Sequence, residues 1–326
     1  MLPFGYRLIK KIMKTFPFFL LFILLGFTTH FGYSQGCSDA GFCTMGAMKP
    51  DQQYSKRIPL KLRTFGVSYY QGKSTLTPVI RSVTFDLDFK LGNKGAFQVK
   101  VPYMWVEGSL GNTAGVSDIS LSYTRNVYRN YNFDINVTVG AKIPTNNSNL
   151  EDGDRGRDLP MYYQTSLGSY DIVLGASLIS KNWLFAVGYQ QALNRNQNRF
   201  AWGEWGDYPF PSYIREYDMG MNLQRGTDVM LRVERNFRFS RFNFNIGVLP
   251  IYRITKDEVM NPMTGQRVKL DNTTGLALSA LAGVGYSFNV SSSLKLMYGY
   301  KFTDREVNPD GLTRDNVLTV SYLLNF

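Results

Sequence analysis

The sequence predicts an all-β fold, a transmembrane antiparallel β-barrel of about twelve strands. Apolar and polar residues alternate with a period of two along many segments, and short and long connections between those segments alternate along the chain. The chain also ends in an alternating segment that finishes with Phe326. No run of 18 apolar residues follows residue 35, so the sequence predicts no membrane-spanning helix there.

The composition excludes some other classes of protein. The chain has 326 residues, of which 15% are aromatic and 19% are charged, and this disfavours disorder. Its formal charge is +11, but the basic residues are scattered, without a stripe or a nucleic-acid-binding motif. A nucleic-acid partner is therefore not expected.

Residues 1–35 have the features of a cleavable signal peptide. Arg7 and three lysines precede an apolar run at 16–27, which is too short to span a bilayer as a helix. With cleavage near Gln35, four basic residues and the only histidine, His30, would be removed. The formal charge would then become +7.

Residues 36–58 precede the first predicted strand and hold the only two cysteines, Cys37 and Cys43. We expect a disulfide between them, because an exported protein meets an oxidising compartment. An alternative is that Cys37 is acylated, as in a lipoprotein. The two thiols could instead bind a metal, but without histidine they form only half of a zinc site. The segment would either fold into the barrel lumen as a plug or remain a periplasmic tail.

Period-2 alternation places the strands. Phe85, Leu87 and Phe89, for example, are separated by charged residues. The predicted strands are residues 59–71, 77–91, 95–108, 115–127, 131–143, 165–178, 182–193, 225–238, 241–253, 273–288, 291–303 and 314–326. Together they form the predicted barrel domain, residues 59–326.

The connections support a membrane barrel over a soluble sandwich. Tight turns are expected at residues 92–95, 128–130, 179–181, 239–240 and 289–290. The others are mostly longer: 72–76, 109–114, 144–164, 194–224, 254–272 and 304–313. Outer-membrane barrels have short periplasmic turns and longer external loops, whereas a sandwich has no reason to separate loop lengths in this way.

Charged residues on the polar face of the strands are expected to point into the lumen. They could form a polar pathway that selects solutes, or they could pair with one another and fill a narrow barrel. The candidate lumen-lining residues are Asp86, Asp88, Lys90, Lys100, Asp118, Asp134, Asp171, Arg232, Glu234, Lys295 and Lys301.

The predicted loop around residues 199–213 is unusually aromatic. Rigid aromatic side chains suit contact with an apolar ligand at the barrel mouth, but the loop could also pack on itself or rest at the lipid interface. The candidate ligand-contacting residues are Trp202, Trp205, Tyr208, Phe210 and Tyr213. The acidic stretch 151–158 lacks a calcium-loop pattern, so no metal and no cofactor are expected.

The last segment alternates apolar residues with small or polar ones. Tyr322 and the final Phe326 resemble the terminal signal that the outer-membrane assembly machinery reads. The expected partners are therefore this machinery, outer-membrane lipid and a small-molecule solute. The expected location is the cell outer membrane.

Three segments resemble a family of bacterial outer-membrane transporters linked to phenol degradation, the MetA-pathway transporters, which are related to fatty-acid-type channels. They are Gly115–Leu121 with its Gly-x-x-Asp start, Lys142–Thr145 at a strand end, and Leu167–Gly175 with Gly-Ser-x-Asp. The resemblance covers residues 95–190. It implies passive uptake of small apolar compounds and an N-terminal segment in the lumen. The Asn-Pro-Ala signature of fatty-acid channels is absent.

The sequence leaves two function classes open. The first is a passive channel for small molecules, apolar or aromatic ones included. The second is a non-conducting barrel that binds a partner through its long loops. An enzyme is not expected, because the outer-membrane lipases, proteases and acyl-chain removers use histidine, and His30 lies in the predicted leader.

Overall fold

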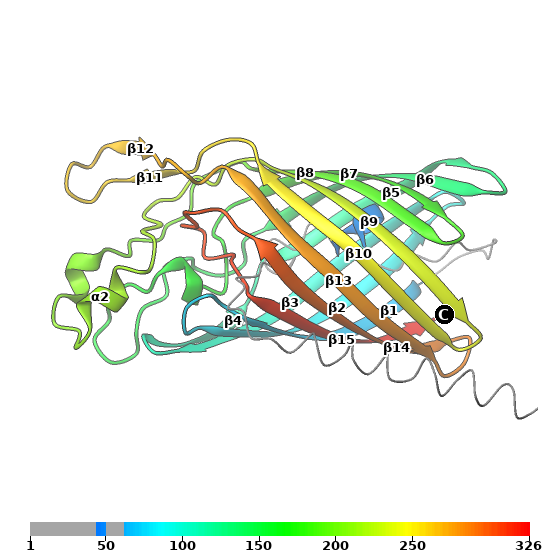
Figure 1. The fold of residues 1–326 in the computed structure, drawn as a ribbon, viewed down its shortest axis with the longest axis horizontal. Coiled ribbons are helices and arrows are strands. Elements are labelled where there is room, and N and C mark those ends of the chain that lie inside the picture. The colour runs from blue at the N-terminus through cyan, green and yellow to red at the C-terminus, as the bar shows by residue number, and fades with distance from the viewer. Residues whose placement is uncertain (1–43, 50–61) are drawn as a thin grey trace, which may run out of the picture. The chain divides into compact units, whose positions relative to one another are not determined.

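The computed structural model describes residues 44–49 and 62–326 (Figure 1). The predicted leader, Cys37 and Cys43 lie outside the described residues, so the signal peptide and the disulfide stay predictions. Within the described residues, no helix is both long enough and apolar enough to cross a membrane.

The described residues form long strands and a few single helical turns. The strands are β1 (Leu62–Lys73), β2 (Val79–Leu91), β3 (Gly95–Gly108), β4 (Gly111–Val116), β5 (Ile119–Arg129), β6 (Phe133–Ile143), β7 (Asp171–Ser180), β8 (Trp183–Ala192), β9 (Asp228–Phe239), β10 (Phe242–Arg253), β11 (Glu258–Met260), β12 (Arg267–Lys269), β13 (Gly275–Ser287), β14 (Ser292–Thr303) and β15 (Asn316–Asn325). The helical turns are η3 (Gly46–Met48), η4 (Met161–Tyr163), η5 (Trp202–Trp205) and α2 (Pro211–Ile214).

The sheet closes on itself as a twelve-strand antiparallel barrel, which confirms the predicted fold class. Neighbouring strands in the chain pair in order, and β1 pairs with β15 from Thr64 opposite Asn325 to Lys73 opposite Asn316. β4 and β5 share one position in the wall, since both pair with β3. The hairpin of β11 and β12 stands apart as a small separate sheet.

The alternation sorts side chains between the outside and the inside of the barrel. On β2, Phe85 is 44% exposed while its neighbour Asp86 is 8% exposed. The same holds on β14, where Leu294 and Leu296 face outward and Lys295 lines an internal cavity. Apolar residues on the outside require hydrocarbon around them, and the backbone amides are bonded between strands. The barrel therefore belongs in the outer membrane.

Loop length separates the two ends of the barrel. The hairpin turns β2–β3, β5–β6, β7–β8, β9–β10 and β13–β14 lie at the end that holds the C-terminus, on the right in Figure 1. The long loops, with α2 and the β11–β12 hairpin, lie at the opposite end. We refer to these as the short-turn end and the long-loop end.

One predicted connection is wrong. Residues 109–114 were expected to be a loop, but β4 begins at Gly111 and pairs with β3 after a two-residue turn. The predicted strand 115–127 is instead broken at residues 117–118. Pro102 of β3 lies opposite this break, where β3 changes partner from β5 to β4, so its missing N–H costs no strand pairing.

The predicted strand 165–178 begins six residues late, at Asp171. Gly168 has a positive φ of 69°, which interrupts an extended strand. Ser166 donates a 2.6 Å hydrogen bond to the Asp118 carboxylate, and the backbone N–H of Leu167 donates another at 3.2 Å. These bonds hold Ser166 and Leu167 against the buried Asp118 instead of in a strand pair.

The seam between β1 and β15 can be tested by cross-linking. Ser68 lies directly opposite Ser321, and their hydroxyl oxygens are 2.8 Å apart. In a chain whose two native cysteines are replaced by serine, we expect S68C/S321C to form a disulfide on mild oxidation. Oxidised and reduced samples would then differ in thiol alkylation by mass spectrometry.

The matched control is S68C/T319C. Thr319 lies opposite Tyr70, so it is diagonal to Ser68 on the same face, where Cα atoms are about 7–8 Å apart, beyond the usual reach of a disulfide. Equal cross-linking of both pairs, or of neither, would contradict the seam register.

Candidate functional site: the lumen

Residues 44–49 lie inside the barrel against one half of its wall. Their helical turn η3 contacts β3, β5, β6, β7 and β8. The backbone N–H of Gly46 donates to Gln98 Oε1 at 3.0 Å, and that of Ala47 donates to Thr138 Oγ1 at 2.8 Å. The short segment is thus held by side chains of the wall in place of a strand partner.

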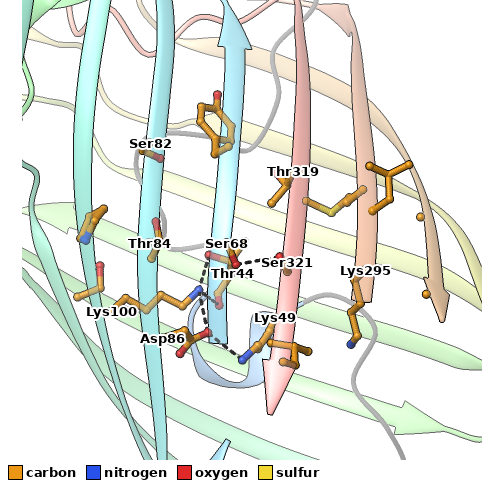
Figure 2. A pocket seen from close by; sticks show the side chains of 18 of the residues that line it. Thr44, Lys49, Ser68, Ser82, Thr84, Asp86, Lys100, Lys295, Thr319 and Ser321 are labelled. Atoms are coloured by element: carbon orange, nitrogen blue, oxygen red, sulfur yellow. Dashed lines mark hydrogen bonds and ion pairs between the residues drawn. The ribbon is translucent and has the colours of Figure 1, made fainter. Parts of the chain in front are cut away.

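Two lysines complete this attachment (Figure 2). The Lys49 ammonium contacts Asp86 at 3.0 Å, as Figure 2 shows. It also contacts Asp88 at 3.1 Å, and both aspartates lie on β2. The Lys100 ammonium donates to the carbonyl and hydroxyl oxygens of Thr44, each at 3.0 Å. Asp86 also accepts from the amide of Gln98 at 2.8 Å. These charged contacts connect both ends of the segment to the wall.

The middle of the segment is held by apolar contacts. Met45 and Met48 are fully buried against Val173, Ala186, Met230, Leu249 and Leu281 of the inner wall. A Cβ at Gly140 would lie 2.7 Å from Met45 Cε, and one at Gly175 would lie 2.8 Å from Met48. The two wall glycines therefore leave the room that the methionines occupy.

A cavity of about 210 Å³ lies beside the segment. Residues of β1, β2, β3, β5, β6, β10, β13, β14 and β15 line it, together with Thr44 and Lys49 (Figure 2). Its polar lining includes hydroxyl and amide groups from Ser68, Ser82, Thr84, Ser117, Ser120, Asn243, Asn245, Thr319 and Ser321. Apolar side chains, among them Met104, Met297 and Leu323, also border it, so the open space combines polar groups with apolar surface.

The lining carries more positive than negative charge. Four lysines (Lys49, Lys100, Lys142 and Lys295) and two aspartates (Asp86 and Asp118) border the cavity, a formal excess of two positive charges. Lysines without an equal number of carboxylates favour anions in a confined space.

Most of the predicted lumen residues take part in ion pairs, and four of them border the cavity. Asp86, Lys100, Asp118 and Lys295 border the cavity. The pairs, with nearest N–O distances, are Asp134 with Arg129 (2.7 Å), Arg232 with Glu234 (3.4 Å), Lys301 with Asp304 (2.7 Å), Asp88 with Lys49 (3.1 Å), and Asp171 with Arg225. Lys90 is partly buried near the short-turn end. Paired charges therefore fill part of the lumen, and the pathway that selects solutes stays a prediction.

Buried charges continue from the cavity toward the long-loop end. Lys142 lies 3.6 Å from Asp118, and both side chains are almost fully buried. Next along the wall, Asp171 accepts hydrogen bonds from Arg225, Gln190 and Ser169. The charges alternate in sign, so each buried group has a partner of opposite charge.

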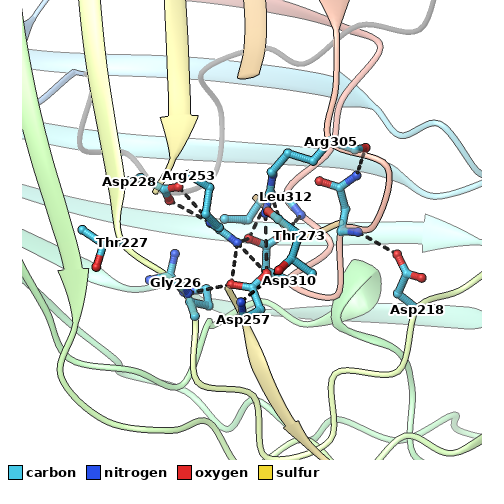
Figure 3. Close-up of polar contacts among 12 residues, drawn as sticks. Asp218, Gly226, Thr227, Asp228, Arg253, Asp257, Thr273, Arg305, Asp310 and Leu312 are labelled. Carbon is cyan, nitrogen blue, oxygen red and sulfur yellow. Dashed lines mark hydrogen bonds and ion pairs between the residues drawn. The ribbon is translucent and has the colours of Figure 1, made fainter. Parts of the chain in front are cut away.

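A larger ionic cluster joins the long loops to the barrel rim (Figure 3). Arg253, at the end of β10, is 2% exposed and contacts Asp228 at 2.7 Å, Asp257 at 2.8 Å and Asp310 at 2.9 Å. Arg305 adds a second guanidinium, 3.3 Å from Asp310. Two strands and the loops 254–274 and 304–315 thus meet at one buried site.

The loop aspartates of this cluster have shifted pKa values. Burial raises the pKa of Asp310, but the guanidinium groups of Arg305 and Arg253 outweigh burial and hold it well below the ordinary value. For Asp257, burial is the larger effect and the pKa is raised, although Arg253 opposes the shift. Asp310 is therefore the carboxylate whose ionised form the cluster stabilises most clearly.

The aromatic loop packs largely against the barrel rim. Trp205 is 1% exposed, donates to the carbonyl of Asp158 at 3.1 Å, and lies under the Arg157 guanidinium. Tyr208 and Tyr213 pack against the same buried cluster, which includes Tyr163 and Tyr217. Most of the aromatic loop therefore packs on itself and on the barrel rim, which is one of the arrangements that the sequence left open.

Two of the candidate aromatic residues remain accessible. Trp202 is partly exposed and donates to the Tyr217 carbonyl at 2.9 Å, and Phe210 is the most exposed of the five.

At the other end of the barrel, Tyr322 faces outward and Phe326 follows β15. Their proposed role as an assembly signal stays a prediction.

Sequence reasoning missed several residues of the site. Lys142 and Arg253 lie on the inward register of their strands and could have been included with the other lumen charges. Asp257, Arg305 and Asp310 lie in loops without periodicity, so no local pattern signals their meeting. Among the described residues, no group of histidine, cysteine, aspartate and glutamate side chains is arranged to hold a metal ion.

The comparisons with known proteins bear on the fold. No protein-family model and no curated protein sequence matches the chain. The solved COG4313 outer membrane channel from Pseudomonas putida F1 has a TM-score of 0.61 and 15% identity, over 85% of this chain and 99% of that one. The NanC porin has a TM-score of 0.44 and 9% identity, over 81% of this chain and 98% of that one. The CymD monoaromatic hydrocarbon channel has a TM-score of 0.40 and 11% identity, over 91% of this chain and 95% of that one. At 15% identity, the first likeness shows a shared fold of the outer-membrane barrel type.

The ionic cluster can be tested through Asp310. Removing one partner of a buried charge cluster costs roughly 3–5 kcal/mol, so we expect D310N to loosen loop 304–315. Limited proteolysis in detergent at neutral pH would show faster cleavage of this loop. The control D271N removes an exposed carboxylate that pairs with Lys256, and it should leave the cleavage rate nearly unchanged.

The same cluster predicts a pH dependence. Because the folded pKa of Asp310 is depressed, its contribution is complete above the unfolded value of about 4 and is lost as the pH falls below it. The wild-type loop should therefore become protease-sensitive on acidification below about pH 4. In D310N this acid-induced change should be smaller, and an equal change in both proteins would contradict the assignment.

Proposed function

We propose that this protein is a passive outer-membrane channel for small solutes, and that residues 44–49 restrict its lumen. The observation that carries the proposal is the internal cavity in a closed barrel, bordered by lysine, hydroxyl and amide groups and lying beside a chain segment held by side-chain contacts. A wall made only for packing would leave no such space. We also propose that the protein is not an enzyme.

The lining of the cavity supports a polar solute, with a preference for anions. Hydroxyl and amide groups can replace the hydration shell of a passing solute, and the excess of lysines attracts negative charge. The size of the cavity, about 210 Å³, suits a small molecule.

An apolar or aromatic solute, which the sequence resemblance implies, would have a second surface available. A cluster of apolar inner-wall residues lies beneath Met45 and Met48. Such a solute would have to displace these methionines, whose flexible side chains adapt readily to other apolar groups. A polar or charged solute can instead contact the hydroxyl, amide and lysine groups of the cavity without displacing the two methionines.

The role of residues 44–49 can be tested at Gly46. This residue has a positive φ of 47°, and a Cβ there would lie 2.4 Å from Thr124 Oγ1 and 2.5 Å from Thr138 Cγ2. Left-handed backbone costs alanine roughly 1–2 kcal/mol, and the clash adds to this. We expect G46A to release the segment and to raise single-channel conductance in planar bilayers several-fold.

The matched control is G285A in the same lumen. Gly285 lines the cavity, but a Cβ there would lie 3.6 Å or more from other atoms, which is an ordinary contact. Its conductance should remain near the wild-type value. If G46A also conducts like the wild type, residues 44–49 do not restrict the pore. If neither variant nor the wild type conducts, the protein is a non-conducting binding barrel.

The anion preference can be tested at Lys295. Replacing this cavity lysine by glutamine lowers the formal positive excess of the lining from two to one. We expect the reversal potential of K295Q in a salt gradient to move from the anion-selective side toward zero. K269Q, in the β12 hairpin strand outside the barrel, should leave the reversal potential unchanged. A wild-type channel that prefers cations would contradict this part of the proposal.

A further inference from the structure

The outer surface at the short-turn end carries a group of cations beside an aromatic band. Lys181 lies in the β7–β8 turn, Arg235 and Arg238 lie near the end of β9, and Arg241 lies in the β9–β10 turn. We call these four residues the basic patch. The two turns are adjacent, because β8 pairs with β9 as far as Trp183 opposite Arg235, and the Arg238 guanidinium donates to the Lys181 carbonyl.

The basic patch has almost no acidic residue near it in the sequence. In residues 176–188 and 233–247, which form these hairpin ends, Glu234 is the only acid. Its side chain is buried in the lumen, 3.4 Å from Arg232, so it faces away from the outer surface. Lys181, Arg238 and Arg241 are exposed. The patch is therefore a net positive surface.

Arg235 is the member that faces the lipid directly. It lies on the outward register of β9, with its guanidinium carbon 4.8 Å from the centroid of the Trp183 ring and 5.6 Å from that of Phe237. Stacking uses the faces of the guanidinium and leaves its N–H groups at the edge. Within the described part of the chain, Arg235 has no carboxylate partner and its side chain donates no hydrogen bond.

Aromatic side chains fix the depth of this patch in the membrane. Trp183 stacks with Phe185 at 5.8 Å, and Phe242 contacts Phe244 at 6.3 Å and Tyr286 at 4.9 Å. Exposed aromatic girdles of this kind lie at the level of the lipid headgroups. The N–H groups of Arg235 are therefore at the height of lipid phosphates.

The opposite end of the barrel provides a contrast. Arg81 also faces outward, near the long-loop end of β2, but its guanidinium contacts the Glu107 carboxylate at 2.5 Å. An arginine that already has a carboxylate has less to gain from a phosphate. Arg235 lacks such a partner, and three more cations lie close to it in the hairpin ends.

From these observations we infer that the basic patch binds the headgroup of an anionic phospholipid in the membrane leaflet that surrounds the short turns. The Arg235 guanidinium donates to the phosphate in a fork, while Lys181, Arg238 and Arg241 add charge at the membrane surface. The aromatic girdle holds the upper acyl chains. This site is separate from the lumen and does not depend on the channel proposal.

The test uses the whole barrel in detergent, titrated with phosphatidylglycerol and followed by native mass spectrometry. A cation beside an anionic surface contributes roughly a factor of five in affinity, so R235Q should bind phosphatidylglycerol roughly fivefold more weakly than the wild type. R235Q/R238Q should bind roughly 25-fold more weakly. R235K, which keeps the charge, should lose less than R235Q, and the control R81Q should bind like the wild type.

Three results would overturn the inference. One is equal binding of phosphatidylglycerol and zwitterionic phosphatidylcholine, which would indicate only an apolar annulus. Another is equal phosphatidylglycerol binding by R235Q/R238Q and the wild type. The third is preferential binding of lipid A at these residues, which would place the patch in the other leaflet. Folding of R235Q is judged by heat-modifiable migration on a gel. If R235Q does not fold, R238Q and R241Q are compared with the wild type instead, because Arg238 and Arg241 lie at the exposed hairpin ends.

Discussion

A backbone amide in hydrocarbon must find its hydrogen-bond partner within the protein, because no water is there to replace it. The pairing of β1 with β15 meets this constraint, since it removes the two free edges that a twelve-strand sheet would otherwise have. Closure also divides every strand into an outward and an inward face. Alternating apolar and polar residues are the chemical consequence, as Phe85 and Asp86 illustrate on β2.

Closure places charged groups in an interior where each of them needs a partner. Pairs such as Asp118 with Lys142, and the cluster around Arg253, meet that need. Replacing such pairs by apolar residues is often neutral for stability, but losing one partner is costly. We therefore interpret the Arg253 cluster as a device that fixes the loops 254–274 and 304–315 in one arrangement over the barrel.

Residues 44–49 occupy part of the lumen and leave a cavity beside them. Met45 and Met48 cover a cluster of apolar wall residues, while lysine, hydroxyl and amide groups, together with apolar side chains, border the open space. The attachment of the segment uses contacts that other groups can replace, namely two lysines, two methionines and single hydrogen bonds. A segment held by such contacts can restrict the lumen and still let a solute pass.

Alternation with period two is a local property of consecutive residues, so the barrel, its approximate strand number and the inward register could be predicted from the sequence. The inward positions of Asp86, Lys100 and Lys295 follow from the same alternation. Which charges meet depends on how the chain folds. Asp257 and Asp310 join Arg253 from loops that have no periodicity, and Trp205 is buried because distant loops fold over it. Loop contacts depend on the packing of segments far apart in the chain, and no spacing along the sequence records them.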